Sequence, residues 1–468
     1  MTPEVLIIGA GMGGLTAALR LARRGCHVRV VEASDAPGGL AAGLEREGFR
    51  FDAGPYLLLD RPGLAWAFHA SGLDLAERVP MRRVEDVYQV EAADGSVVRI
   101  HADLKKTADG IEQTWPGGGL RYREFVASVS RVHKRLRPLL TSPRPSPATL
   151  LRTGAWRGLP FLLRPLRSVL ARAGLPPAVA DAVAIWTHVA GQTTSEAPSP
   201  LAFVAAVLHG VGAYYPEGGL GAVPMALEAA AVEAGVEFLY GTAVTAIRSE
   251  GGRARGVATA SGSILEADAV VSNRNGVGTY LELARRRARR GATPAGRPPA
   301  PVARRLRLPG RPRRSRAPYL RFRLPGGGEP CRLLVTPAAI LPGLRRDGWS
   351  PARLIAPMAY ADAQRLGPAG QREYLERVLA EPWWREHVGE ARVLDARTPA
   401  DWGSACHLHR ESMNPVMTAQ FMRSGDSHTG ARTSNGSTSP AAPRTRASGS
   451  ASASSGVLAA DRLLEDLG

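Results

Sequence analysis

The alternation of apolar and polar positions predicts a βαβ unit at the start of the chain. Residues 4–8 form a short β-branched apolar run, residues 15–22 are the small and apolar residues of a packed helix, and residues 27–32 form a second strand. Gly25 follows the helix, where a glycine often ends helical structure. Strand, turn, helix and strand within about 30 residues are typical of a parallel βαβ unit.

The rest of the chain alternates between both kinds of element. Residues 84–100 predict a hairpin around Asp94 and Gly95, because Asp-Gly supplies the positive φ angles of a tight turn. Residues 121–190 are helical in pattern, with several prolines, and 222–234 predict another helix. Strands are expected near 237–240, 244–247 and 267–273. The pattern predicts an α/β protein, and 468 residues exceed a single core.

Composition adds little to this picture. The apolar share of 44% is ordinary for a folded protein, and no run of about 18 apolar residues predicts a transmembrane helix. No signal-peptide pattern opens the chain, so we expect a cytoplasmic protein. Its three cysteines, Cys26, Cys331 and Cys406, are too far apart to predict a disulfide framework or a metal site.

The net charge of +18 is concentrated in one stretch. Residues 284–316 hold thirteen arginines and no acid, so the other 435 residues carry only +5. These arginines are interleaved with Pro and Gly instead of lying on a patterned face, and we therefore predict no nucleic-acid partner. A second irregular stretch, residues 424–455, contains no large apolar side chain, but residues 456–467 again predict an amphipathic helix.

The turn after the first strand carries the motif G-x-G-x-x-G. Gly9 permits the tight turn, Gly11 lets the backbone approach a pyrophosphate, and Gly14 lets helix and strand pack closely. Gly13 lies in the same loop, and the N–H groups at the start of the helix face the phosphate charge. A strand before and a helix after the motif favour a Rossmann-like nucleotide site. The alternative is a glycine-rich turn without a ligand.

Glu32 lies at the end of the second strand, eighteen residues after Gly14. A carboxylate at this place can accept hydrogen bonds from ribose hydroxyls and repels a 2′-phosphate, which favours FAD or NAD over NADP. The alternative is a solvated acid at a strand end.

A second glycine loop favours FAD over NAD. Gly38, Gly39 and Leu40 follow Glu32 closely, and a further turn contains Gly54 and Pro55. Such loops let the chain run beside a long cofactor, although two ordinary turns would look the same.

The first 70 or so residues resemble the FAD domain of the phytoene desaturase and amine oxidase superfamily. That family has the same order of strand, glycine motif, helix, Glu-ended strand, Gly-Gly loop and Asp-x-Gly-Pro turn. The family often has a basic residue where this chain has Leu40. The segment from Tyr214 to Gly219 and residues 267–273 resemble the carotenoid desaturase branch, and by this resemblance the backbone of Val244 would contact the adenine. Residues 330–423 match loosely.

The resemblance implies a Rossmann-like FAD-binding domain and a discontinuous α+β substrate domain. The FAD-binding domain would comprise residues 1–72, 211–283 and 405–468, and the substrate domain residues 73–210 and 317–404. The segments 284–316 and 424–455 would be anomalous. They replace a helix and strand of the substrate domain, and the strand and glycine-rich turn before the last helix. We consider two explanations, translation out of frame in a GC-rich gene with the frame restored downstream, and genuine insertions.

The expected function is hydride transfer from a carotenoid-type polyene to FAD, in a desaturation or an isomerisation. Because the flavin accepts the hydride, the protein needs an apolar tunnel more than a catalytic triad, and we name no catalytic residue. Cys406 and the two histidines after it lack zinc spacing, so no metal is expected. The alternatives are an amine oxidase or protoporphyrinogen oxidase relative, and a catalytically impaired flavin-binding relative.

The segment from Leu150 to Leu175 is rich in leucine and arginine and contains no acid. It predicts either contact with a membrane surface, where a lipophilic substrate could be collected, or plain helices that cover the substrate domain.

Overall fold

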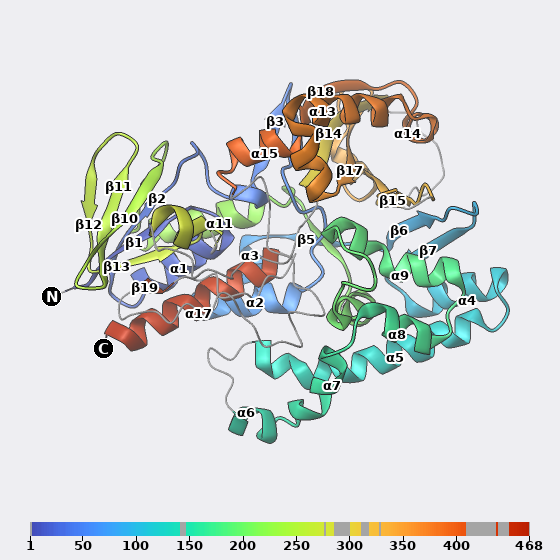
Figure 1. The fold of residues 1–468 in the computed structure, drawn as a ribbon, viewed down its shortest axis with the longest axis horizontal. Coiled ribbons are helices and arrows are strands. Elements are labelled where there is room, and N and C mark those ends of the chain that lie inside the picture. The colour runs from blue at the N-terminus through green and yellow to red at the C-terminus, as the bar shows by residue number, and fades with distance from the viewer. Residues whose placement is uncertain are drawn as a thin grey trace.

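The computed structural model describes residues 2–140, 147–275, 278–284, 300–309, 318–326, 329–408, 437–438 and 449–467. Figure 1 shows a parallel sheet with its helices on one side of the molecule, and a larger sheet above a group of helices on the other side.

The first sheet is parallel and contains the βαβ unit predicted from the sequence. Its strand order is β19-β13-β1-β2-β9. The bounds are β1 (Glu4–Ile8), β2 (His27–Val31), β9 (Glu237–Leu239), β13 (Ala269–Ser272) and β19 (Ser437–Thr438). The apolar residues of β1 are at most 6% exposed, as expected for a parallel strand covered on both faces. Strands leave β1 in both directions, so β1 and β13 flank a topological switch point.

Three helices cover this sheet, namely α1 (Met12–Ala22), α11 (Ala222–Glu233) and α17 (Gly449–Leu467). Helix α17 crosses α1 so closely that a Cβ atom on Gly456 would lie 2.2 Å from the carbonyl oxygen of Gly13. Arg20 of α1 donates to Asp461 of α17 at 2.8 Å, and it also donates to the carbonyl of Ala70. Figure 1 shows α17 lying across the same side of the sheet as α1 and α2.

The second sheet has seven strands in the order β18-β14-β17-β16-β15-β6-β7. We call it the substrate sheet, after the substrate domain that the sequence resemblance leads us to expect in this part of the chain. The bounds are β6 (Asp86–Glu91), β7 (Val97–His101), β14 (Ala300–Pro309), β15 (Leu320–Arg323), β16 (Arg332–Val335), β17 (Trp349–Met358) and β18 (Arg392–Arg397). The predicted hairpin is confirmed as β6 and β7, which pair antiparallel.

Helices cover the substrate sheet on two sides. On one side lie α13 (Tyr360–Ala380), α14 (Pro382–Val388) and α15 (Pro399–Ala405). The other group contains α4 (Leu104–Thr114), α5 (Gly118–Leu136), α6 (Pro147–Arg152), α7 (Leu159–Leu162), α8 (Leu166–Ala173), α9 (Pro177–Ala190) and α10 (Phe203–Gly210). Trp186 of α9 packs edge-on against Tyr88 of β6 and Phe322 of β15, at centroid distances of 5.5 and 5.9 Å.

Small elements join the two halves. They are the strand pairs β3 (Gly43–Arg46) with β4 (Phe49–Asp52) and β5 (Met81–Arg83) with β8 (Tyr214–Pro216), and the helices α2 (Arg61–Ala70) and α3 (Leu75–Arg78). The three-stranded sheet of β10 (Val244–Glu250), β11 (Arg253–Thr259) and β12 (Ile264–Glu266) instead packs on the outer side of the parallel sheet (Figure 1).

The structure differs from the sequence-based expectation in both anomalous segments. Within 284–316, residues 300–309 form β14, which pairs with β17 over ten positions and with β18. Within 424–455, residues 437–438 form β19 beside β13, and the last helix begins at Gly449 instead of residue 456. Residues 300–309, 437–438 and 449–455 thus lie in strands and a helix although the sequence pattern marked both segments as anomalous, because strand pairing and helix docking depend on distant partners. Residues 285–299, 310–316, 424–436 and 439–448 lie outside the described residues.

We predict that Gly456→Ala destabilises the protein, because its new Cβ would clash with the backbone of α1. The free energy of unfolding should fall by about 1–3 kcal/mol, the usual cost of overpacking. Chemical denaturation followed by circular dichroism measures this change. Gly110→Ala in α4 is the control, because no atom lies within 4 Å of its added Cβ. Equal stability of both variants would contradict the close crossing of α1 and α17.

Candidate functional site

The glycine loop after β1 is shaped by two backbone requirements. Gly9 has a φ of +97°, and a Cβ atom on Gly14 would lie 2.0 Å from the carbonyl oxygen of Gly9. Since an L side chain is strained at the first position and is excluded by backbone at the second, both positions require glycine.

Helix α1 begins behind this loop with an open N-terminus. Gly11 is its N-cap, no side chain caps the helix, and its first turn contains no acidic residue. The first amide groups of a helix have no partner within the helix, and together with the helix dipole they attract an anion. The loop also lies at the switch point between β1 and β13, where ligands of open α/β sheets bind. The arrangement fits a pyrophosphate group.

Glu32 lies beside the loop at the end of β2. Its Oε2 accepts a hydrogen bond from the amide of Ala10 at 2.7 Å, and its Oε1 accepts one from the amide of Ser34 at 2.8 Å and one from the Ser34 hydroxyl. An ionised carboxylate offers roughly four lone-pair sites, so capacity remains for a ribose hydroxyl.

The second glycine loop lies directly against the first. The amide of Gly38 donates to the carbonyl of Ala10 at 2.8 Å, and Gly38 forms a parallel bridge with Gly11. A Cβ atom on Gly39 would lie 3.7 Å from the Cα of Gly11.

The Gly54–Pro55 turn extends this arrangement. A Cβ atom on Gly54 would lie 2.3 Å from the carbonyl oxygen of Leu40. Three segments separated in the sequence therefore form one continuous backbone surface, which we call the cradle and define by residues 9–14, 38–40 and 54–55.

Val244 and Gly13 lie at the margins of the cradle. Val244 begins β10, two residues after Thr242, whose amide donates to the carbonyl of Glu32 at 2.8 Å. Val244 is thus at the Glu32 end, and Pro55 is at the opposite end. The carbonyl of Gly13 faces Gly456 of α17, so the structure gives Gly13 a packing role that the motif does not reveal.

Asn273 is a site residue that the sequence analysis missed. It follows β13, and its amide donates to the carbonyl of Ile8 at 2.8 Å. Its side-chain Nδ2 would lie only 2.6 Å from a Cβ atom on Gly11. The sequence signal that could have identified Asn273 is its position, a polar residue directly after a strand at the switch point.

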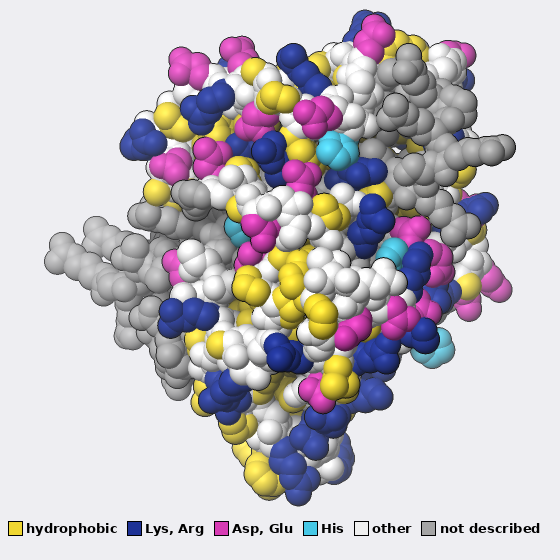
Figure 2. Space-filling view, turned by 90° about the vertical axis from the view of Figure 1, so that its right-hand side faces the viewer, with side chains coloured by type: hydrophobic (Ala, Val, Ile, Leu, Met, Phe, Trp, Pro, Cys, Tyr) yellow, Lys and Arg dark blue, Asp and Glu magenta, His cyan; other side chains and the backbone are white. Residues whose placement is uncertain are grey.

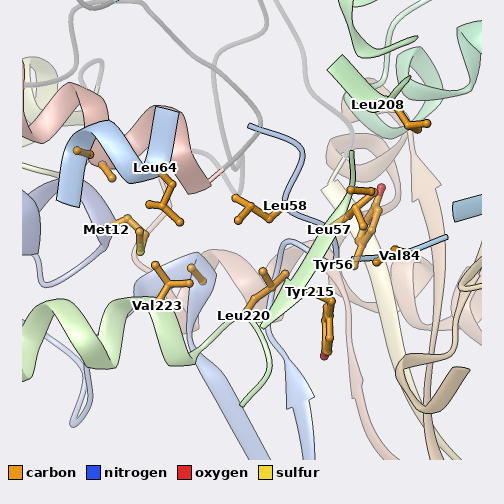
Figure 3. Packing of buried hydrophobic residues seen from close by; sticks show 14 of the residues in the cluster. Met12, Tyr56, Leu57, Leu58, Leu64, Val84, Leu208, Tyr215, Leu220 and Val223 are labelled. Atoms are coloured by element: carbon orange, nitrogen blue, oxygen red, sulfur yellow. The ribbon is translucent and has the colours of Figure 1, made fainter. Parts of the chain in front are cut away.

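Asp52 connects the cradle to the turn before α11. Its buried carboxylate accepts hydrogen bonds from the Tyr215 hydroxyl at 2.8 Å and from the amide of Leu220 at 2.7 Å. The pKa of Tyr215 is raised well above its usual value, mainly by burial and to a smaller extent by the negative charge of Asp52. The hydroxyl therefore stays protonated and remains a donor. Figure 3 shows Tyr215 and Leu220 beside Tyr56, Leu57 and Leu58, which follow Pro55.

The buried titratable groups near the helices serve structural roles. Burial lowers the pKa of His209 to about 4, and its ring nitrogens contact the Tyr122 hydroxyl at 2.9 Å and the carbonyl of Ala102 at 3.3 Å. Among the described residues, no three His, Cys, Asp or Glu side chains form a group that could hold a metal ion. Cys406 lies at the end of α15, and His409 lies outside the described residues.

A cavity of about 540 Å³ lies apart from the cradle. It is lined by residues of α2 and α3 and by the turn after α10, including Arg61, His69, Leu73 and Tyr214. The guanidinium of Arg61 lies 5.1 Å from the centroid of the Tyr214 ring. The cradle residues do not line this cavity, so the two features are distinct.

Comparison with known proteins identifies related sequences. Residues 12–273 match the family described as flavin containing amine oxidoreductase. The chain is 33% identical over 285 residues to the zeta-carotene-forming phytoene desaturase of Myxococcus xanthus, covering 58% of this chain and 53% of that protein. It is 33% identical over 294 residues to phytoene desaturase of Cercospora nicotianae, covering 60% of this chain and 46% of that protein. The chain thus spans about half the length of the curated relatives it matches.

Solved structures share the fold. An oxidoreductase from Methanosarcina mazei superposes with a TM-score of 0.60 at 17% identity, covering 84% of this chain and 87% of the other. A redesigned putrescine oxidase superposes with a TM-score of 0.66 at 15% identity, covering 99% of both chains. These likenesses confirm the predicted α/β fold class.

The matched residues 12–273 include Gly13 and Gly14, Glu32, the Gly38–Leu40 loop, the Gly54–Pro55 turn and Val244, while Gly9 and Gly11 lie just before the match. The match extends over more than half of the chain and confirms the expected flavin cofactor, FAD. The chain therefore belongs to the flavin containing amine oxidoreductase family.

Proposed function

We propose that the protein is an FAD-dependent oxidoreductase that desaturates or isomerises a carotenoid-type polyene. The observation that carries this proposal is the cradle, which is continuous from Glu32 at one end to Pro55 at the other. The first glycine loop and Glu32 would hold the adenosine and pyrophosphate part of the cofactor, and the second loop and the turn extend the surface as far as the substrate sheet. The polyene substrate is supported by relatives that are named phytoene desaturase and hydroxyneurosporene desaturase.

Bound FAD would supply a hydride acceptor, which is the chemistry that a desaturation requires. The residues of this chain would bind and orient it. The open N-terminus of α1 would hold the pyrophosphate, and Glu32 would accept a hydrogen bond from a ribose hydroxyl. The backbone of Gly38 to Leu40 would lie along the rest of the FAD molecule. Leu57 and Leu58, which are 8% and 3% exposed, would keep water from the end of the cradle.

The domain boundaries follow from the same proposal. The segments 1–72, 211–283 and 405–468 would build the FAD-binding domain, and segments 73–210 and 317–404 the substrate domain. The parallel sheet draws its five strands from the first group of segments, which supports this division.

A membrane-facing surface is part of the proposal. The segment from α6 to Leu163, the residue that caps the C-terminus of α7, exposes Leu151 (70%), Trp156 (46%) and Leu163 (48%) beside several arginines. Figure 2 shows arginine and apolar side chains together at the lower tip of the molecule. Apolar side chains flanked by arginines suit the boundary between acyl chains and anionic head groups. Across the described residues, every helix is too short or too polar to cross a bilayer.

We predict that the purified protein is yellow and releases FAD on heating. Glu32→Gln should weaken FAD binding roughly tenfold or more, because hydrogen bonds to a charged group contribute about 1.5–3 kcal/mol. Titration of flavin fluorescence measures the affinity. Glu237→Gln is the matched control, since Glu237 is a more exposed acid on β9 of the same sheet. A colourless protein that binds no adenine dinucleotide would remove the basis of the proposal.

We predict that an acyclic polyene such as phytoene, added without oxygen, bleaches the bound flavin. Putrescine and protoporphyrinogen should leave the visible spectrum unchanged. Each compound is titrated into the protein, and the visible absorbance of the oxidised flavin at the end of each titration shows which compound reduces it. Bleaching by putrescine would instead support an amine oxidase, and a flavin that none of them reduces would support a non-catalytic flavin-binding relative.

We predict that the protein sediments with vesicles of phosphatidylcholine and phosphatidylglycerol, and that Trp156→Ala combined with Leu163→Ala reduces the bound fraction several-fold. The substitutions remove the apolar surface of the two side chains, which would otherwise insert at the boundary between head groups and acyl chains. Met225→Ala is the control, because Met225 is 63% exposed on α11, away from this surface. Equal binding of both variants would favour plain covering helices.

A further inference from the structure

The segment from Asp52 to Tyr56 is held from one side by the substrate sheet. Arg353 of β17 donates from Nη1 to the carbonyl of Asp52 at 2.6 Å and from Nη2 to the carbonyl of Gly54 at 2.7 Å. The hydroxyl of Tyr319, just before β15, donates to the carbonyl of Tyr56. The carbonyls of Asp52, Gly54 and Tyr56 are thus bonded to side chains that lie in the substrate sheet or directly before one of its strands.

The other edge of the segment faces the cradle. The amide of Ala53 donates to the carbonyl of Ala42 at 2.9 Å, and Gly54 packs against the carbonyl of Leu40. Pro55 has no amide hydrogen, so it adds no further donor on this edge. The segment therefore lies between the second glycine loop and the substrate sheet, and its position fixes how far apart they are.

Arg353 makes two hydrogen bonds to this segment through its guanidinium. It is 4% exposed, and its guanidinium lies 5.4 Å from the centroid of the Tyr56 ring. A buried charge is costly unless it is hydrogen-bonded, and a planar guanidinium can hold two acceptors in fixed geometry where an ammonium cannot. A residue used only to fill the core would carry no charge here.

We propose that Arg353 is a positioning residue of the flavin site, which clamps the Gly54–Pro55 turn so that the end of the cradle meets the substrate sheet in a fixed geometry. This inference rests on the proposed function, because it takes the cradle as the place of FAD. Tyr319 supports the same segment two residues further on. Neither side chain belongs to the nucleotide motif, and both come from the domain proposed to hold the substrate.

The test compares Arg353→Lys with a matched control, Arg332→Lys. Arg332 is a buried arginine on the neighbouring strand β16, 3% exposed, and its guanidinium bonds Glu381 and Glu329. We expect Arg353→Lys to weaken FAD affinity about tenfold and to change the visible circular dichroism of the bound flavin. Arg332→Lys should leave both quantities at the wild-type values, even where the melting temperature falls.

Tyr319→Phe provides a second variant if Arg353→Lys does not fold. It removes one hydroxyl donor to the segment and leaves the ring, so we expect the same spectral change with a smaller loss of affinity. If wild-type protein binds FAD and neither variant at the clamp differs from the Arg332→Lys control, the positioning role is overturned while the proposed function stands. If wild-type protein binds no FAD, both are overturned.

Discussion

Close contact between backbone segments is the constraint on which the site depends. Gly14 lies against the carbonyl of Gly9, and Gly54 lies against the carbonyl of Leu40. A Cβ atom added to Gly221 would lie 2.6 Å from the amide nitrogen of Gly43. At each of these places a side chain would meet main chain, which cannot move aside. The surface that results is made of peptide groups, and it can follow a long polar ligand without interruption. Glycine is therefore a requirement of the architecture and not a sign of flexibility.

The local parts of this architecture could be predicted from the sequence. Three elements depend mainly on residues close to them in the sequence, so the local pattern predicts them: the βαβ unit, the hairpin around Asp94 and Gly95, and the helix 222–234. The glycine spacing and Glu32 also lie within one short unit. The order of strands and helices gave the α/β fold class, which is confirmed. Family resemblance supplied the expected FAD cofactor, which is also confirmed, while the individual cofactor contacts remain predictions.

Distant contacts could not be predicted in this way. Arg353 acts on residues about 300 positions earlier, and nothing in its own strand marks it among the many arginines of the chain. Residues 300–309 form a strand although they lie in a segment dominated by arginine, proline and glycine, because β17 and β18 provide partners on both sides. Gly456 was expected only as the first residue of the last helix, and the crossing with α1 explains why a glycine is needed there. In each case the deciding partner lies in another part of the sequence.

The contact between α1 and α17 also bears on how the protein is made. Arg20 and Asp461, which join these helices, are 441 residues apart in the sequence. At roughly 5–20 residues per second, a ribosome needs about 20 to 90 s to synthesise the intervening chain. During that interval α1 exposes the face that α17 later covers.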